Sequence, residues 1–203
     1  EPPKDYSVNK MDEILNALKK YSDSSPDDTP NVIFVQLESF FDVNDLINVK
    51  FSENPIPNFT SLSERGISGY LTMPVVGAGT VNSEFEVLTG MSVDFFGPGE
   101  HPFKTVLNSY TCETVAYNLM ELGYSTHAIH NYQATFYQRH KIYKNLGFQT
   151  FTPLEYMSDV EYNISGAWPK DNVLTAQIMN ALKSTDTSDF IMTVSVQGHG
   201  KYP

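Results

Sequence analysis

An apolar run that ends in a carboxylate constrains the fold of this chain more than any other stretch. Five of the seven residues from Val32 to Glu38 are large and apolar, with β-branched and aromatic types prominent. Such a run is typical of a strand that is covered on both faces in a parallel sheet. Ligands collect outside the carboxyl ends of the strands in open α/β sheets. Glu38 is therefore a candidate site residue, with a role as a turn cap or a solvent-exposed acid as the alternative.

Segments with strand and helix patterns alternate along the rest of the chain. Apolar runs predict further strands over residues 67–74, 124–130 and 190–196. Helical spacing, capping residues and terminal glycines predict helices over residues 10–22, 57–66, 80–88, 111–122 with Thr111 as the N-cap, within 135–146, and 172–183. This alternation indicates an α/β fold, with a mainly parallel sheet and helices on both faces.

The ends of the chain suggest its domain organisation. The helix predicted over residues 10–22 is amphipathic, and the run from 22 to 29 is polar, so residues 1–30 are predicted to form an N-terminal helix and a linker. Residues 31–203 then form the domain that contains the sheet. The pattern stops directly after an apolar strand, where a domain seldom ends. We therefore expect this chain to be part of a longer protein.

Composition excludes several classes of function. The formal net charge is -11 and Lys and Arg do not cluster, so a nucleic-acid partner is not expected. An acidic protein can still bind an anionic substrate if its site supplies a metal ion and a few local cations. Cys112 is the only cysteine, which excludes an intrachain disulfide and a cysteine-based zinc site.

Four polar residues are predicted to lie on one rim of the sheet. Glu38, Thr80, His130 and His199 each fall at a predicted strand end or in the loop or helix start that follows one. Because parallel strands have their carboxyl ends at the same edge, these side chains should converge there. A single histidine in such a place is more often a structural residue, so the convergence carries the argument.

Thr80 is the candidate nucleophile on this rim. Threonine reacts weakly at neutral pH, but a metal ion bound to its oxygen would lower the pKa of the hydroxyl. The N-terminus of the helix predicted over 80–88 would also favour an anion or a developing alkoxide. Glu38 could be one ligand of such an ion. One carboxylate and one hydroxyl do not complete a metal site, so further ligands are needed.

Four segments of the sequence resemble a known family. They are residues 35–40, residues 77–85, residues 130–139 continuing to Tyr143 and Gly147-Phe148, and residues 194–199. In order and spacing they are similar to the extracellular catalytic domain of lipoteichoic acid synthases. These are membrane-anchored phosphoglycerol transferases of the alkaline phosphatase and sulfatase superfamily. The resemblance covers nearly the whole chain from Asn31 onward and implies that residues 31–203 are the first part of a sulfatase-like catalytic domain.

The resemblance implies a role for each rim residue. Glu38 matches a glutamate that binds a divalent metal, usually Mn²⁺ or Mg²⁺, and Thr80 matches the nucleophilic threonine, which also contacts that metal. His130, Arg139 and His199 match residues that hold the phosphoglycerol group, and the guanidinium of Arg139 suits a phosphate. A further substrate-binding residue, Tyr137, stands where the synthases have a tryptophan in the wall of the same pocket.

The sequence also departs from the family pattern. Tyr132 stands where the synthases have an aspartate, and Gly79 stands where they have a lysine before the nucleophile. Both differences change the charge of the pocket and leave the donor and the acceptor open. The family completes its metal site with a Gly-Asp-His motif at a position beyond Pro203, and this chain contains no Asp-His dipeptide. We therefore expect only part of the metal site here, weak or absent metal binding, and no activity from this chain alone.

The resemblance leads to a hypothesis about function. The parent protein would transfer phosphoglycerol from a phosphatidylglycerol-type lipid to a cell-envelope glycan or teichoic acid. Its partners would be the anionic glycerophospholipid headgroup and the envelope polymer, and it would be anchored in the membrane with this domain on the extracellular face of a bacterial cell. A phosphoethanolamine transferase or phosphodiesterase-like hydrolase of the same superfamily is one alternative. A non-catalytic module that binds glycerophosphate polymers is another.

Overall fold

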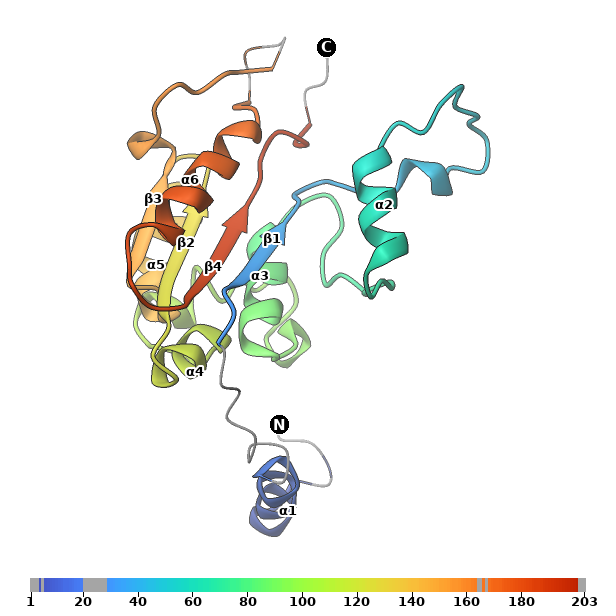
Figure 1. Ribbon diagram of the computed structural model, residues 1–203. Coiled ribbons are helices and arrows are strands. Elements are labelled where there is room, and N and C mark those ends of the chain that lie inside the picture. The colour runs from blue at the N-terminus through green and yellow to red at the C-terminus, as the bar shows by residue number, and fades with distance from the viewer. Residues whose placement is uncertain (1–3, 5, 20–28, 164–165, 167, 201–203) are drawn as a thin grey trace.

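A four-stranded, fully parallel sheet forms the centre of the molecule (Figure 1). The computed structural model describes residues 4, 6–19, 29–163, 166 and 168–200. The strand order is β1-β4-β2-β3, with β1 at Val32–Gln36, β2 at Ser125–His130, β3 at Thr150–Pro153 and β4 at Asp189–Val194. The strands predicted over 124–130 and 190–196 are confirmed as β2 and β4. The sequence pattern missed β3.

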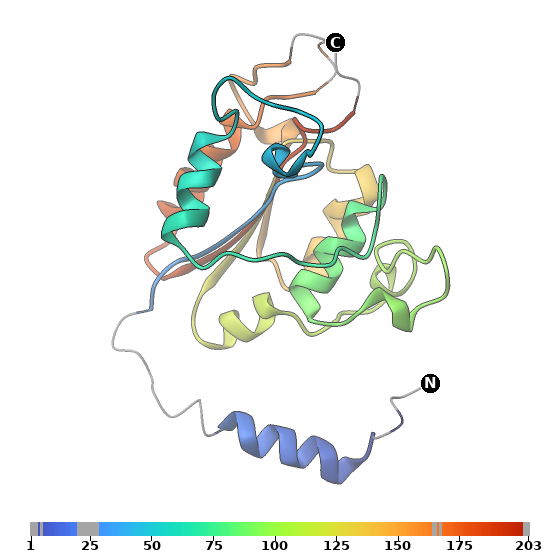
Figure 2. The same cartoon turned by 90° about the vertical axis from the view of Figure 1, so that its right-hand side faces the viewer.

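Helices cover both faces of this sheet, as the alternating pattern predicts (Figure 2). One face packs Ile129 of β2 and Ile191 of β4 against Val173 and Leu174. These two residues belong to α6, which spans Asn172–Leu182. The opposite face packs the other side of β2 and β4 against three helices, α3 (Thr80–Thr89), α4 (Val115–Glu121) and α5 (Arg139–Asn145). The α/β fold class is confirmed.

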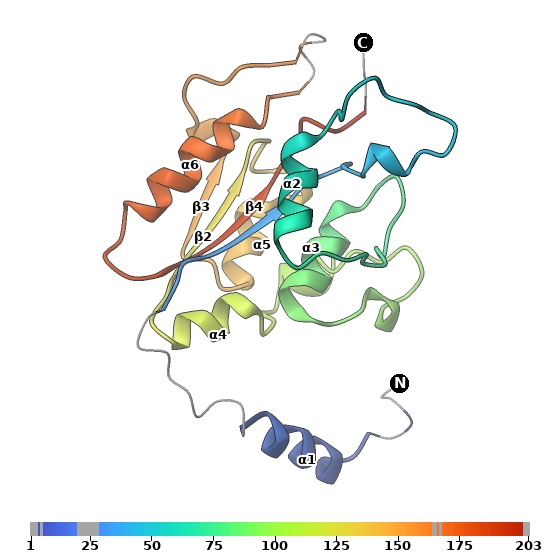
Figure 3. The same ribbon diagram turned by 45° about the vertical axis from the view of Figure 1, so that its right-hand side comes forward.

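Strand β1 is buried less than its apolar sequence predicts. It lies at the edge of the described sheet and pairs only with β4 there. Ile33 and Val35 are 41% and 51% exposed, so the prediction that both faces are covered is wrong. The pairing puts Ile33 beside Ile191, on the face that α6 covers. Figure 3 shows α6 at the end of the sheet away from β1, where it packs on β4 and β2.

Two further sequence predictions are corrected. Residues 67–74 form no strand, because no neighbouring strand takes their backbone hydrogen bonds and apolar side chains such as Ile67 are fully exposed. Thr111 is not the cap of the following helix. Thr114 is, since its Oγ1 accepts hydrogen bonds from the backbone N–H groups of Ala116 and Tyr117. The residues before it stay extended, with the N–H of Cys112 bonded to the carbonyl of Asn145.

The remaining predicted helices are present with shifted ends. The helix predicted over 57–66 is α2 (Pro57–Arg65), and the one predicted within 135–146 is a 3-10 turn at Phe136–Gln138 followed directly by α5. The helix predicted over 10–22 is α1 (Val8–Lys19). Its last predicted residues and nearly all of the predicted linker lie outside the described residues. No helix in the described part of the chain is long and apolar enough to cross a bilayer.

Candidate active site

A cavity of about 860 Å³ opens at the carboxyl end of β1. Four of the six residues that the sequence singled out line it, namely Glu38, Thr80, Tyr137 and His199. Most of the remaining lining comes from β1 and the residues just after it, from residues 71–79 and from α3, and Phe136 and Met192 complete it. Of the four residues predicted to converge on one rim, Glu38, Thr80 and His199 line the cavity and His130 does not. Thr80 follows a loop rather than a strand.

A hydrogen bond joins the two residues expected to carry the chemistry. Thr80 Oγ1 donates to Glu38 Oε1 over 2.6 Å, and the Glu38 side chain is only 11% exposed. Glu38 lies two residues after β1, and its backbone N–H donates to Ser195 Oγ just beyond β4. Thr80 is the first residue of α3, after Gly79 in the left-handed conformation with φ of 84°. The sheet and the helix thus hold carboxylate and hydroxyl together from separate elements.

A glycine lets the loop after β4 approach Glu38. A Cβ on Gly198 would lie 2.7 Å from the carbonyl oxygen of Glu38, so no side chain fits at this position. The next residue, His199, places its Nε2 3.9 Å from Glu38 Oε1. Its Nδ1 is buried and has no hydrogen-bond partner among the described residues. The His199 imidazole therefore lies beside the Thr80 hydroxyl and the Glu38 carboxylate as a third polar group.

Arg139 lies outside the cavity lining, in a buried cluster. Its guanidinium pairs with the carboxylate of Glu84, through Nη2 to Oε1 and through Nε to Oε2 at 3.3 Å. The hydroxyl of Tyr143 donates to the same carboxylate over 2.8 Å. Burial alone would lower the pKa of Arg139, but the Glu84 carboxylate raises it above its ordinary value, so the side chain stays charged. Arg139 Nη1 is buried and has no hydrogen-bond partner in the part of the chain described.

Sequence reasoning did not single out Glu84 as a site residue. It follows Thr80 by one helical turn, so the two residues occupy the same face of α3. That spacing was the available signal. Glu84 is fully buried, and its carboxylate orients Arg139 while Thr80, one turn earlier, faces the cavity.

His130 is also buried and does not line the cavity. Its Nδ1 lies 2.9 Å from the carbonyl oxygen of Val194, and a carbonyl can only accept, so Nδ1 carries the proton. Burial, together with the positive charge of Arg139, lowers the pKa of His130 to about 3. The imidazole is therefore neutral at pH 7, and its Nε2 is an acceptor.

The donors at the cavity fit part of a coordination sphere for a divalent metal. Glu38 and Thr80 supply the oxygen ligands that Mg²⁺ and Mn²⁺ prefer. Gln36 also lines the cavity, and its Oε1 is buried without a hydrogen-bond partner in the described chain. The described residues contain no group of three or more His, Cys, Asp or Glu side chains that could hold an ion. A complete site would need further ligands.

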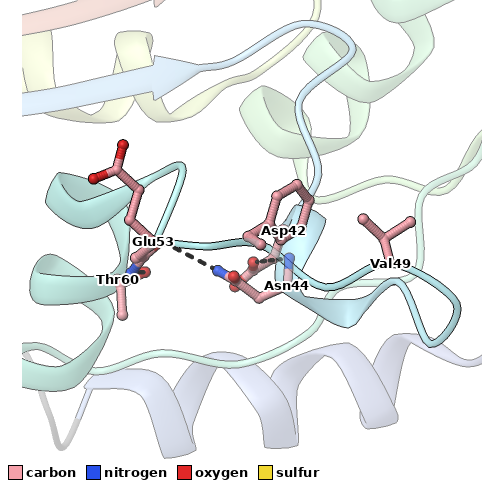
Figure 4. A pocket seen from close by; sticks show the side chains of 7 residues that line it. Asp42, Asn44, Val49, Glu53 and Thr60 are labelled. Carbon is pink, nitrogen blue, oxygen red and sulfur yellow. Dashed lines mark hydrogen bonds between the residues drawn. The ribbon is translucent and has the colours of Figure 1, made fainter.

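A second hollow, of about 540 Å³, lies in the loops between β1 and α2. Figure 4 shows hydrogen bonds between several of its polar side chains and neighbouring residues. Asp42 Oδ1 accepts from the backbone N–H of Asn44, and the Asn44 amide donates to Asn54 Oδ1. None of the predicted site residues lies there. The cavity at Thr80 is therefore the site that the sequence and the structure share.

A family model described as Sulfatase matches residues 30–203, which is most of the chain. The chain belongs to the sulfatase family. A putative cyclic beta-1,2-glucan modification protein of Rhizobium meliloti (strain 1021) is 32% identical over 173 residues, covering 85% of this chain and 26% of that protein. The capsular polysaccharide biosynthesis protein RkpI of the same strain is 27% identical over 203 residues, covering 98% of this chain and 37% of RkpI.

Solved structures share the fold of this sulfatase-family chain. The Streptococcus pyogenes phosphoglycerol transferase GacH, in complex with sn-glycerol-1-phosphate, matches with a TM-score of 0.82 at 22% identity, over 100% of this chain and 55% of that one. The lipoteichoic acid synthase LtaP from Listeria monocytogenes matches with a TM-score of 0.69 at 24% identity, over 84% of this chain and 41% of LtaP. These likenesses agree with the resemblance stated from the sequence.

A third structure belongs to the alkaline phosphatase superfamily and comes from Vibrio parahaemolyticus, with a TM-score of 0.66 and 20% identity. It covers 98% of this chain and 52% of that one. The chain therefore spans about half the length of these structures, and less of the two Rhizobium proteins. The fold class is that of the alkaline phosphatase and sulfatase superfamily.

Proposed function

We propose that the protein containing this domain transfers phosphoglycerol from a phosphatidylglycerol-type lipid to a cell-envelope glycan, with Thr80 as the nucleophile. The observation that carries the proposal is the 2.6 Å hydrogen bond from Thr80 Oγ1 to Glu38 in the cavity. A carboxylate at this distance orients the hydroxyl and can accept its proton. Thr80 also begins α3, whose N-terminal N–H groups favour negative charge.

The reaction proceeds in two displacements. In the first, Thr80 Oγ1 forms a bond to the lipid phosphorus while the bond from phosphorus to the diacylglycerol oxygen breaks. The threonine proton passes to Glu38, and the departing oxygen takes a proton by way of His199, whose Nε2 lies 3.9 Å from Glu38 Oε1. In the second, a hydroxyl of the glycan forms a bond to the phosphorus while the bond from phosphorus to Thr80 Oγ1 breaks. The glycan proton passes to His199 and Glu38, and Glu38 returns a proton to Thr80 Oγ1.

Residues around Thr80 and Glu38 suit the two halves of the transferred group. Arg139 keeps its charge, and its buried Nη1 has no hydrogen-bond partner among the described residues, which leaves a donor for a charge-assisted bond to phosphate once the side chain reaches the cavity. The neutral His130 offers an acceptor nitrogen, which suits a glycerol hydroxyl better than a phosphate oxygen. Tyr137 forms part of the cavity wall.

A divalent metal, Mn²⁺ or Mg²⁺, would be held by Glu38 and Thr80 and would supply positive charge that lowers the pKa of the hydroxyl and stabilises the phosphoryl oxygens. We propose that residues 31–203 are the first part of the catalytic domain and that a Gly-Asp-His motif beyond Pro203 provides the remaining ligands. The two halves of the domain would then share one metal site.

The relatives support the substrate class. GacH is a phosphoglycerol transferase bound to sn-glycerol-1-phosphate and LtaP is a lipoteichoic acid synthase. The two Rhizobium proteins are named for cyclic β-1,2-glucan modification and capsular polysaccharide biosynthesis. On this basis we propose a neutral glucan as the acceptor and the extracellular face of a membrane-anchored protein as the place of reaction. A nucleic-acid partner does not fit a net charge of -11.

The proposal is tested by trapping the covalent intermediate. The full-length protein is incubated with phosphatidylglycerol labelled in its headgroup and with Mn²⁺, and the peptide containing Thr80 is analysed by mass spectrometry. We expect a phosphoglycerol adduct on Thr80, none in Thr80→Ala, and chase of the label into cyclic β-1,2-glucan. An adduct formed only from phosphatidylethanolamine would favour a phosphoethanolamine transferase. Free glycerol phosphate without a glucan product would favour a hydrolase, and binding without any adduct would favour a non-catalytic module.

A further inference from the structure

Five ring-bearing side chains form a continuous series at the cavity, which we call the aromatic arc. In order they are Tyr137, Phe136, Tyr132, Trp168 and His199, and successive ring centroids are 4.5, 5.3, 5.3 and 4.4 Å apart. The first, second and last of them line the cavity. The arc thus begins at the cavity, runs through two further rings and returns to it.

Three separate segments build the arc. Tyr132 follows β2, and Tyr137 and Phe136 belong to the 3-10 turn before α5. Trp168 lies in the segment before α6, and His199 lies in the loop after β4. Phe136 is 42% exposed, and Trp168 and Tyr132 are half-buried, so the rings present faces that a ligand can reach.

The backbone that carries Tyr137 is conformationally strained. Tyr137 has φ of 53° and ψ of 18°, and the next residue, Gln138, has φ of 58° and ψ of 26°. Two successive non-glycine residues in the left-handed region cost on the order of 1–3 kcal/mol each. The Tyr137 ring is fixed further by Lys104 Nζ and Arg139 Cζ, each 5.4 Å from its centroid. Strain of this kind is typical of a side chain held in place for binding.

The chemistry of the arc differs from that of the rest of the cavity lining. Aliphatic residues, among them Leu37, Leu71 and Met73, line another part and are partly exposed. Such groups suit the hydrocarbon of a lipid donor. Four of the five rings of the arc carry a hydroxyl or a ring nitrogen, and Phe136 is the one purely apolar ring. The negative face of an aromatic ring attracts the weakly positive C–H groups on the face of a sugar, while hydroxyl and ring N–H groups bond its rim.

We propose that the aromatic arc is the acceptor subsite and that it binds the sugar rings of a neutral glycan by stacking. This inference deepens the proposed transferase function and rests on it, because it assigns a place to the group that receives phosphoglycerol. Tyr132 places an uncharged ring in the middle of the arc, which suits a neutral sugar better than a charged one.

Trp168 is the only tryptophan of this chain, and the part of the emission change that Trp168→Phe abolishes reports on the arc in the longer protein. We would titrate the full-length protein with cyclic β-1,2-glucan and, separately, with sn-glycerol-1-phosphate. We expect the glucan to change Trp168 emission in a saturable manner. Phe136→Ala should weaken glucan binding about tenfold, since it removes an exposed stacking face and leaves the tryptophan in place. Tyr132→Phe keeps the ring and removes only its hydroxyl, so it should weaken glucan binding less than Phe136→Ala does.

The controls separate this inference from the proposed reaction. Tyr110 is 69% exposed and lies outside the arc, so Tyr110→Ala should leave glucan binding unchanged. Thr80→Ala should bind glucan normally and lose transfer. An unchanged emission at saturating glucan, or binding that Phe136→Ala does not weaken, would overturn the acceptor subsite. Normal glucan binding in a wild-type protein that transfers nothing would instead refute the proposed reaction.

Discussion

The two ends of the sheet carry the same kinds of side chain and use them differently. At the amino end, His127 lies between Asp189 and Thr150, with Nε2 3.1 Å from Asp189 Oδ1 and Nδ1 2.7 Å from Thr150 Oγ1. Thr185 donates to the same aspartate over 2.7 Å. Both nitrogens of the histidine are occupied, and the ring is almost fully buried.

The carboxyl end also combines a histidine, a carboxylate and a hydroxyl, in His199, Glu38 and Thr80. There, polar atoms remain without partners among the described residues, including His199 Nδ1, Gln36 Oε1 and Arg139 Nη1. A cavity lies beside them. The comparison teaches that residue types do not identify a site by themselves. Unsatisfied hydrogen-bonding capacity next to a cavity distinguishes the reactive end from the structural end.

Removing one threonine hydroxyl at each end of the sheet is the most direct test of this difference between the two ends. Thr80→Ala is expected to lower phosphoglycerol transfer by about a thousandfold or more, because it removes the proposed nucleophile. Thr185→Ala, the matched loss at the amino end, should leave kcat unchanged and cost about 1 kcal/mol of unfolding free energy. Transfer assays and urea unfolding of both variants give the two numbers. Equal losses of activity would mean that the two ends do not differ in this way.

The buried ion pair of Glu84 and Arg139 tests whether paired groups at the carboxyl end stabilise the fold. Glu84→Ala leaves the guanidinium of Arg139 buried without its partner and should cost about 3–5 kcal/mol of unfolding free energy. Denaturant unfolding measures this loss. The exposed pair of Glu161 and Lys170 is the control, and Glu161→Gln should change stability little. A small effect of Glu84→Ala would show that solvent reaches Arg139.

Gly198 tests whether the proposed reaction depends on the position of the Glu38 carboxylate. In Gly198→Ala the new Cβ would meet the Glu38 carbonyl at 2.7 Å and displace the segment that carries the carboxylate. A shift of about 1 Å in a reacting group can cost on the order of a hundredfold in rate, so we expect a loss of that size in kcat. Gly200→Ala has no atom near its added Cβ and should keep full activity. Comparable rates for both variants would show that Glu38 tolerates movement.

His130, at the carboxyl end, should make the unfolding free energy depend on pH. Its pKa in the folded protein is about 3, below the ordinary 6.5, so the unfolded chain binds the extra proton first as pH falls. The stabilisation from this group is full above about pH 6.5 and is lost between there and pH 3, by up to about 1.4 kcal/mol per unit. Urea unfolding at pH 7 and pH 4.5 should show this slope, and His130→Gln should remove that part of it. An unchanged slope in the variant would mean that the imidazole is solvated.

The sequence predicted the fold class because apolar runs and helical spacing are local signals. Strand β3 escaped this reading because Thr150–Pro153 is short, half polar and ends in proline. Residues 67–74 were misread because an apolar run does not reveal whether a partner strand exists. The open face of β1 was missed for a similar reason, since burial depends on neighbours that the run itself does not specify.

The site could be predicted in part. Glu38 and Thr80 stood out because one follows a strand and the other begins a helix, and both lie together in the cavity. The resemblance, rather than spacing, supplied the roles of His130 and Arg139, and the structure buries both outside the cavity lining. The contact of Gly198 with Glu38 depends on strand order, which the pattern of apolar residues does not give.

The pairing of β1 with β4 has a consequence for biosynthesis. β1 is the first and β4 the last strand along the described chain, yet the two strands are paired in the sheet. The backbone N–H of Glu38 also donates to Ser195 Oγ, which is 157 positions away in the sequence. On the ribosome, β1 emerges long before its neighbour does. Contacts of such high sequence separation form slowly, because a long loop must close first. The Glu38 carboxylate should therefore reach its final position only after β4 has been synthesised, so the proposed site cannot form before that point.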